Sequence, residues 1–181
     1  MNTPLRIGIS ACLVGQEVRF DGGHKRDRLL MEIFGTHVEW VAVCPEVEVG
    51  MGTPREPLRL ERDAGRVRMV TVETRVDYTE RMEAWSRKRL AELSRLELDA
   101  YVLKSDSPSC GKDGVKLFDY GRAPSREGTG LFARALMAAM PLLPVEDEAR
   151  FRDPDVRKDF LARIGAYRKS RGLRARPDIE H

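Results

Sequence analysis

Residues 99–111 read DAYVLKSDSPSCG, an apolar run that ends in a short polar turn carrying Cys110. The same pattern occurs twice earlier in the chain, where LRIGIS precedes Cys12 and VEWVAV precedes Cys44. Short runs of β-branched and aromatic residues that stop at turn-forming residues are typical of strands. We therefore interpret each of the three cysteines as following the end of a strand.

The segments between and after these strands have the periodicity of helices. Asp77 and Glu80 have capping-box spacing at the start of one such segment, and residues 128–140 and 153–164 predict two more helices. The run RVRMVTVE alternates apolar and polar residues, as a half-exposed strand does. Strands that alternate with helices predict an α/β fold: a single domain with a mostly parallel open sheet and helices on both faces, a Rossmann-like three-layer arrangement.

Length, charge and cysteine content narrow the class of protein. A chain of 181 residues suits one domain, which we divide into residues 1–150 and a C-terminal helix and basic tail over 151–181. No apolar run reaches the length of a membrane span, and the N-terminus lacks the apolar core of a signal peptide, so we expect a cytoplasmic protein with no membrane partner. A net charge of +3 does not indicate polymeric nucleic acid, and the oligomeric state stays open. Three cysteines without an export signal argue against a disulfide framework.

The placement of the cysteines points to a shared site. In open α/β sheets, ligands gather beyond the carboxyl ends of the strands, where loops from different βα units converge. Separations of 32 and 66 residues are too long for a zinc knuckle, although a parallel sheet can bring the three loops together. Each cysteine alone is often a small buried apolar residue. Three converging thiolates suit zinc with an open fourth position or an iron-sulfur cluster, and a [4Fe-4S] cube would then keep one iron open to substrate as a Lewis acid.

Three segments carry a resemblance to a known family. In this order, ISACLVGQEVRFDGGHKRD, VCPEVEVGMGTPREP and KSDSPSCGKDG resemble the thiouracil desulfurase family, an iron-sulfur desulfidase domain formerly of unknown function. The resemblance covers roughly residues 6–145. It implies that Cys12, Cys44 and Cys110 hold a [4Fe-4S] cluster whose fourth iron takes up the sulfur of a thiolated pyrimidine. The sulfur then leaves as sulfide by non-redox hydrolysis, and the base keeps an oxygen in its place.

The hydrolysis needs a base and groups that hold the pyrimidine. Glu46 and Glu48 follow Cys44, and in an extended segment they point in opposite directions, so we prefer Glu48 as the catalytic base and assign Glu46 a structural role. Serine hydroxyls near the last cysteine are candidates for hydrogen bonds to the pyrimidine edge or the cluster sulfides. We prefer Ser105 for this role, ahead of Ser107 and Ser109.

The basic residues of these loops suggest that the substrate is a thiolated nucleoside or nucleotide rather than the free base. Arg59 stands where many relatives carry an acid, and a phosphate would be met by lysine or arginine. The remaining candidates for substrate binding are His24, Lys25, Arg26, Arg55 and Lys104.

Two other functions are compatible with three cysteines. A non-enzymatic protein could hold structural zinc through them. An electron carrier would need a fully ligated cluster, and three cysteines are one ligand short of that.

Overall fold

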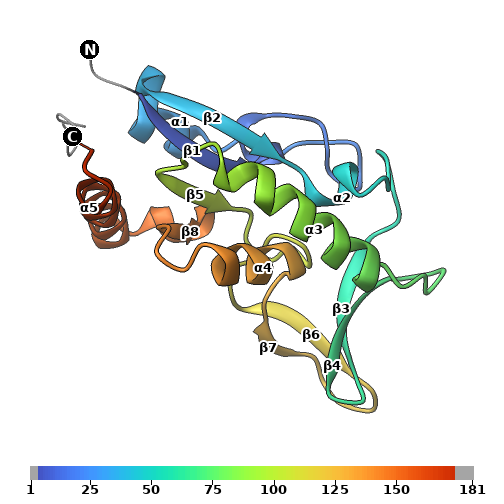
Figure 1. The fold of residues 1–181 in the computed structure, drawn as a ribbon. Helices are drawn as coiled ribbons and strands as arrows, with labels where there is room; N and C mark the ends of the chain where they lie inside the picture. The colour runs from blue at the N-terminus through green and yellow to red at the C-terminus, as the bar shows by residue number, and fades with distance from the viewer. Residues whose placement is uncertain (1–3, 174–181) are drawn as a thin grey trace.

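Sheet A contains the strands that the three cysteines follow, with one more strand at its edge (Figure 1). In this computed structural model, which describes residues 4–173, the strand order is β2 (Val38–Val43), β1 (Leu5–Ser10), β5 (Ala100–Leu103) and β8 (Val145–Asp147). All neighbours in this sheet are parallel. Parallel strands end at the same edge, so β2, β1 and β5 deliver the residues that follow them to neighbouring positions.

Helices cover both faces of sheet A, which confirms the predicted α/β layers. Alternate residues of β5 belong to two different apolar clusters, because successive side chains of a strand point to opposite faces. Tyr101 and Leu103 pack with helices α3 (Thr79–Ser94) and α4 (Leu131–Ala139). Residues of the other face pack with α1 (Arg28–Phe34) and α5 (Pro154–Ser170).

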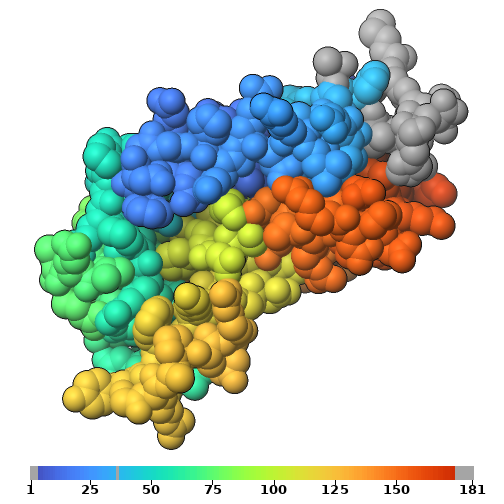
Figure 2. All heavy atoms as spheres, turned by 180° about the vertical axis from the view of Figure 1, so that it is seen from behind, coloured from blue at the N-terminus to red at the C-terminus, as the bar shows by residue number. Residues whose placement is uncertain are grey.

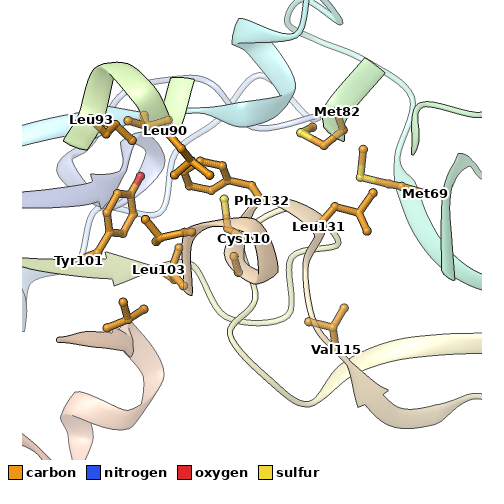
Figure 3. Packing of buried hydrophobic residues seen from close by; sticks show 14 of the residues in the cluster. Met69, Met82, Leu90, Leu93, Tyr101, Leu103, Cys110, Val115, Leu131 and Phe132 are labelled. Atoms are coloured by element: carbon orange, nitrogen blue, oxygen red, sulfur yellow. The ribbon is translucent and has the colours of Figure 1, made fainter. Parts of the chain in front are cut away.

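The cluster under α3 and α4 is built around Tyr101, which is fully buried (Figure 3). Its ring lies 5.9 Å from that of Phe132, between centroids, and over Gly8 of the neighbouring strand β1. A Cβ at position 8 would lie 2.2 Å from Cδ2 of Tyr101, so glycine is required for this packing. Cys110 belongs to the same cluster. The loop that carries it is therefore seated on the core of the domain.

Sheet B projects from the domain and was not predicted as a separate sheet (Figures 1 and 2). Its strand order is β4 (Arg66–Thr71), β3 (Leu58–Asp63), β6 (Val115–Asp119) and β7 (Ser125–Gly128), with only the β3–β6 pair parallel. The sequence pattern predicted β4 alone. The sequences of β3 (LRLERD) and β7 (SREG) contain too few apolar residues to show an alternating pattern.

Helix boundaries differ from the predicted ones in detail. Helix α3 begins at Thr79, whose backbone N–H and hydroxyl both donate to Asp77 Oδ1. Helix α5 is capped by Asp153 and continues beyond its predicted end at residue 164. Phe160 of α5 is fully buried in the cluster on the α1 face, so this helix packs with the rest of the domain. The last part of the predicted basic tail, residues 174–181, lies outside the described residues.

Short helical turns complete the part of the chain that the structure describes. They are η1 (Ala11–Val14), η2 (Gly35–His37), α2 (Pro45–Glu48) and η3 (Glu148–Arg152). Between residues 4 and 173, no helix combines the length and the apolar character that a membrane span requires.

Candidate functional site

A cavity of about 330 Å³ lies at the carboxyl end of sheet A, and all three cysteines line it. Its walls come from the loops after β1, β2 and β5, together with the start of β3. Figure 2 shows the blue segment that follows β1 adjoining the yellow-green segment that follows β5. Of the other predicted site residues, those that line the cavity are Lys25, Glu46, Arg55, Lys104, Ser105, Ser107 and Ser109.

The three thiols are buried to different extents and are close enough to influence one another. Cys12 and Cys110 are buried, and Cys44 is half-buried. Burial raises the pKa of all three, that of Cys12 to about 11, because a thiolate is poorly solvated there. The charge of Cys44 raises the pKa of both other thiols further. A bound metal reverses this tendency, since coordination deprotonates a thiol.

Hydroxyl groups favour the thiolate form of Cys110. Side-chain hydrogen bonds from Ser10 and Ser109 lower the pKa of Cys110 and partly oppose the effect of burial. Ser10 also accepts a hydrogen bond from the backbone N–H of Lys104 at 2.9 Å. Ser10 therefore links the end of β1 to the loop that carries the last cysteine.

The three thiols of the cavity are suitable ligands for an iron-sulfur cluster. Thiolates also suit zinc, but one zinc ion needs all its ligands at about 2.3 Å from one centre. Within residues 4–173, no group of three His, Cys, Asp or Glu side chains is placed to hold one metal ion. A [4Fe-4S] cube with three protein ligands binds each to a different iron, which keeps the three sulfur atoms farther apart.

Glu46 projects into the cavity wall and is held on both carboxylate oxygens. Its Oε1 accepts a hydrogen bond from Ser109 Oγ at 2.7 Å, and its Oε2 accepts from Arg55 Nε at 2.8 Å. Arg55 Nη1 also donates to the carbonyl oxygens of Val18 and Gly52, each at 2.9 Å. The Arg55 side chain is only 5 % exposed. The carboxylate is thereby fixed in orientation beside the cysteines.

Glu48 does not line the cavity, although we preferred it as the base. The segment after Cys44 is the helical turn α2 and not the extended segment we expected. Glu48 Oε1 accepts a weak hydrogen bond from the Cys44 backbone N–H at 3.4 Å, and Oε2 pairs with Arg89 of α3 at 3.1 Å. Burial raises the pKa of Glu48, and Arg89 opposes the shift. Its contacts are with Arg89 of α3 and with the backbone of Cys44.

Ser107 and Ser109 form a line of hydroxyl groups that ends at Glu46. Their Oγ atoms lie 3.0 Å apart, and Ser107 Oγ also accepts from the backbone N–H of Cys110 at 3.0 Å. The first amides of α4 donate to the same loop, with Phe132 N–H bonded to Ser109 O at 3.0 Å. A Cβ at Gly130 would lie 2.5 Å from that carbonyl oxygen, so glycine permits the close approach.

Ser105 and Lys104 are held by a residue that the sequence analysis missed. Glu148, just after β8, accepts hydrogen bonds from Ser105 Oγ at 2.9 Å and from Lys104 Nζ. Glu148 directly follows β8 as Cys44 directly follows β2, so its place after a strand was a signal that could have identified it. Residues at strand ends therefore include a carboxylate of this site as well as the cysteines.

Three of the six basic residues predicted to meet a phosphate already have carboxylate partners. Arg55 pairs with Glu46 and Lys104 with Glu148, while Arg59 pairs with Glu61 in a second cavity over sheet B. His24 does not line the cavity, and its Nδ1 accepts from the Arg26 backbone N–H at 3.1 Å. Lys25 does line the cavity. The charge available to a nucleotide phosphate is therefore smaller than the sequence suggested.

Comparison with known proteins gives a consistent result. The chain is 32% identical over 109 residues to the uncharacterized protein YbbK of Bacillus subtilis (strain 168), which covers 57% of this chain and 71% of that protein. A solved structure of TudS, a [4Fe-4S]-dependent thiouracil desulfidase, is similar with a TM-score of 0.65 and 27% sequence identity, over 86% of this chain and 98% of TudS. Residues 7–148 match the family described as 2-thiouracil desulfurase. The chain therefore belongs to the 2-thiouracil desulfurase family.

Proposed function

We propose that this protein binds a [4Fe-4S] cluster through Cys12, Cys44 and Cys110 and removes sulfur from a thiolated pyrimidine as sulfide. The observation that carries the proposal is the meeting of three cysteines, each from a different strand end, in the same cavity as the fixed carboxylate of Glu46. The desulfidase activity of TudS supports it. When bound, the cluster would supply an open iron that acts as a Lewis acid toward the substrate's sulfur.

The overall reaction is a hydrolysis and needs no oxidant or reductant. A water oxygen forms a bond to the ring carbon, the carbon–sulfur bond breaks, and the sulfur leaves as sulfide with the protons of the water. Catalysis therefore requires a group that takes a proton from water and delivers one to a leaving atom.

Glu46 is our proposed acid–base residue, in place of Glu48. Its carboxylate lines the cavity, and the Arg55 guanidinium and the Ser109 hydroxyl fix the orientation of its two oxygens. The hydroxyls of Ser109 and Ser107 extend from Glu46 along the cavity wall and offer a route for a proton. In the same proposal, Ser105 donates to or accepts from the edge of the pyrimidine ring.

The substrate class in this proposal is a thiolated pyrimidine, as a base, nucleoside or nucleotide. A phosphate would meet Lys25, whereas Arg55, Lys104 and Arg59 are engaged by carboxylates. The proposal therefore does not require a phosphate for binding.

Reconstitution tests the proposal directly. The apo-protein is loaded anaerobically with iron and sulfide, its iron content and visible absorption are measured, and it is then incubated with 2-thiouracil or 4-thiouracil while sulfide and uracil are quantified. We expect about four irons per chain and equal amounts of sulfide and uracil. A colourless protein that binds one zinc ion per chain and releases no sulfide would overturn the proposal.

A further inference from the structure

Three consecutive carboxylates, Glu146, Asp147 and Glu148, are buried where β8 ends; we call them the acidic segment. They are 3 %, 3 % and 7 % exposed. Acidic side chains are rarely buried to this extent unless each finds a partner, because an unpaired buried charge is costly. The partners of the acidic segment therefore indicate what it stabilises.

Glu148 accepts hydrogen bonds from the beginning of the loop that carries Cys110. Its Oε2 accepts from the Ser105 backbone N–H at 2.6 Å, and its Oε1 accepts from the Ser105 hydroxyl at 2.9 Å and from the Lys104 ammonium. Every one of these donors belongs to two adjacent residues that line the cavity. Strands β5 and β8 are neighbours with Leu103 paired to Asp147, which brings the two strand ends together.

The other two carboxylates accept hydrogen bonds from the end of the same loop. Asp147 Oδ1 accepts from the Lys112 backbone N–H at 3.1 Å, and Glu146 Oε1 accepts from Lys112 Nζ at 2.8 Å. Lys112 lies two residues after Cys110. The acidic segment thus holds loop 104–112 at both ends, and between them lie the serines and the cysteine of the cavity wall.

We propose that Glu148 is a positioning residue for the desulfidase site. It holds the Ser105 hydroxyl and the Lys104 ammonium at the cavity and, together with Asp147, keeps the Cys110 loop in the geometry that receives the cofactor. This role rests on the proposed function for its catalytic consequence. The effect on the loop itself is independent of any cofactor.

The test uses Glu148→Gln with Asp99→Asn as a matched control. Asp99 is also a buried carboxylate bound to basic residues, with Arg168 at 2.6 Å and Arg171 at 3.1 Å, but it precedes β5 at the end opposite the cavity. Both substitutions remove a buried charge and should lower thermal stability. Only Glu148→Gln should loosen loop 104–112.

The first readout is the rate at which iodoacetamide alkylates each cysteine of the full-length apo-protein, followed by peptide mass spectrometry. In Glu148→Gln, Cys110 should react roughly tenfold faster or more, because hydrogen bonds from two residues to a charged group no longer resist local opening. Cys44 should react at its original rate, because Glu148 is not among the groups that shift its pKa. In Asp99→Asn, the alkylation rates of both cysteines should equal those of the parent protein, once they are corrected for global unfolding measured in the same sample.

The second readout is the behaviour of the reconstituted enzyme. Glu148→Gln should bind less iron. Per bound cluster, its kcat should fall by a larger factor than its KM rises, because Ser105 is no longer held in its orientation at the cavity. Equal alkylation patterns in the two variants would overturn the proposal and leave Glu148 a general stabilising residue. If Glu148→Gln does not fold, Ser105→Ala replaces it, because it removes one contact to Glu148 and keeps the charge. Faster alkylation of Cys110 without sulfide release from any variant would refute the proposed function alone.

Discussion

Replacing Glu46 by Gln, with Glu48→Gln as its partner variant, separates the two carboxylates that follow Cys44. Glutamine retains the shape of Glu46 and an oxygen that can accept from Ser109, but it cannot take a proton from water. The loss of a general base lowers kcat by about 10² to 10⁴, or roughly 2.7 to 5.4 kcal/mol in the activation barrier. Glu48 pairs with Arg89 across side chains that are 31 % and 23 % exposed, a contact worth at most about 1 kcal/mol.

The same substitution also removes the partner of a buried guanidinium, and this effect must be measured separately. The side chains of Arg55 and Glu46 are 5 % and 13 % exposed, and breaking a buried pair of this kind costs about 3 to 5 kcal/mol. We therefore expect a lower melting temperature for the Glu46→Gln apo-protein. Activity has to be normalised to bound iron, so that loss of protein or cluster is not counted as loss of catalysis.

Steady-state sulfide release from the two reconstituted variants gives the decisive comparison. Per bound cluster, Glu46→Gln should lose at least about a hundredfold in kcat and Glu48→Gln less than about fivefold. If Glu46→Gln stays within tenfold of the parent protein, or if Glu48→Gln loses more, the assignment of the base from cavity geometry is wrong.

The three cysteines, Asp147 and Lys25 each allow a further test. Serine at Cys12, Cys44 or Cys110 should abolish iron binding while the apo-protein keeps its circular dichroism spectrum; a variant with full iron and activity excludes that cysteine as a ligand. Burial raises the pKa of Asp147 to about 7, so the folded state holds its proton more tightly and the free energy of unfolding should fall as pH rises from about 4 to 7. The free energy of unfolding of Asp147→Asn, measured with urea, should fall less over this pH range. An equal fall in the parent protein and in Asp147→Asn would contradict the prediction. Lys25→Gln should raise KM about tenfold for a thiopyrimidine monophosphate at low salt and not for the free base. An equal effect on both substrates would exclude a contact between Lys25 and the phosphate.

The strand-end rule predicted the position of the site because it depends on local patterns and on the geometry of parallel sheets. Each cysteine follows a readable apolar run, which predicted that a parallel sheet could bring the three loops together, and the adjacency of β2, β1 and β5 in the structure does so. Sheet B could not be predicted in this way. Its β3–β6 pair joins residues more than fifty positions apart, and its strands are held by that pairing rather than by a clear apolar pattern.

The expected conformation after Cys44 was wrong for a different reason, and it decides which of Glu46 and Glu48 lines the cavity. We treated the segment after Cys44 as extended, although Pro45 is well suited to the first position of a helix and is found there. A one-turn helix changes which carboxylate faces the cavity. Glu148 needed only a wider use of the same rule, since it follows β8 as Cys44 follows β2.

The order in which the chain is synthesised limits when the cofactor can be received. Cys12 and Cys44 leave the ribosome early, but the loop of Cys110 is braced by Glu148, which directly follows strand β8 and is made more than thirty residues later. Until β8 pairs with β5, a nascent chain has the thiols without the frame that holds them, and contacts this distant in sequence form slowly. In the proposed function, iron and sulfide should therefore enter the finished, folded apo-protein and not the nascent chain.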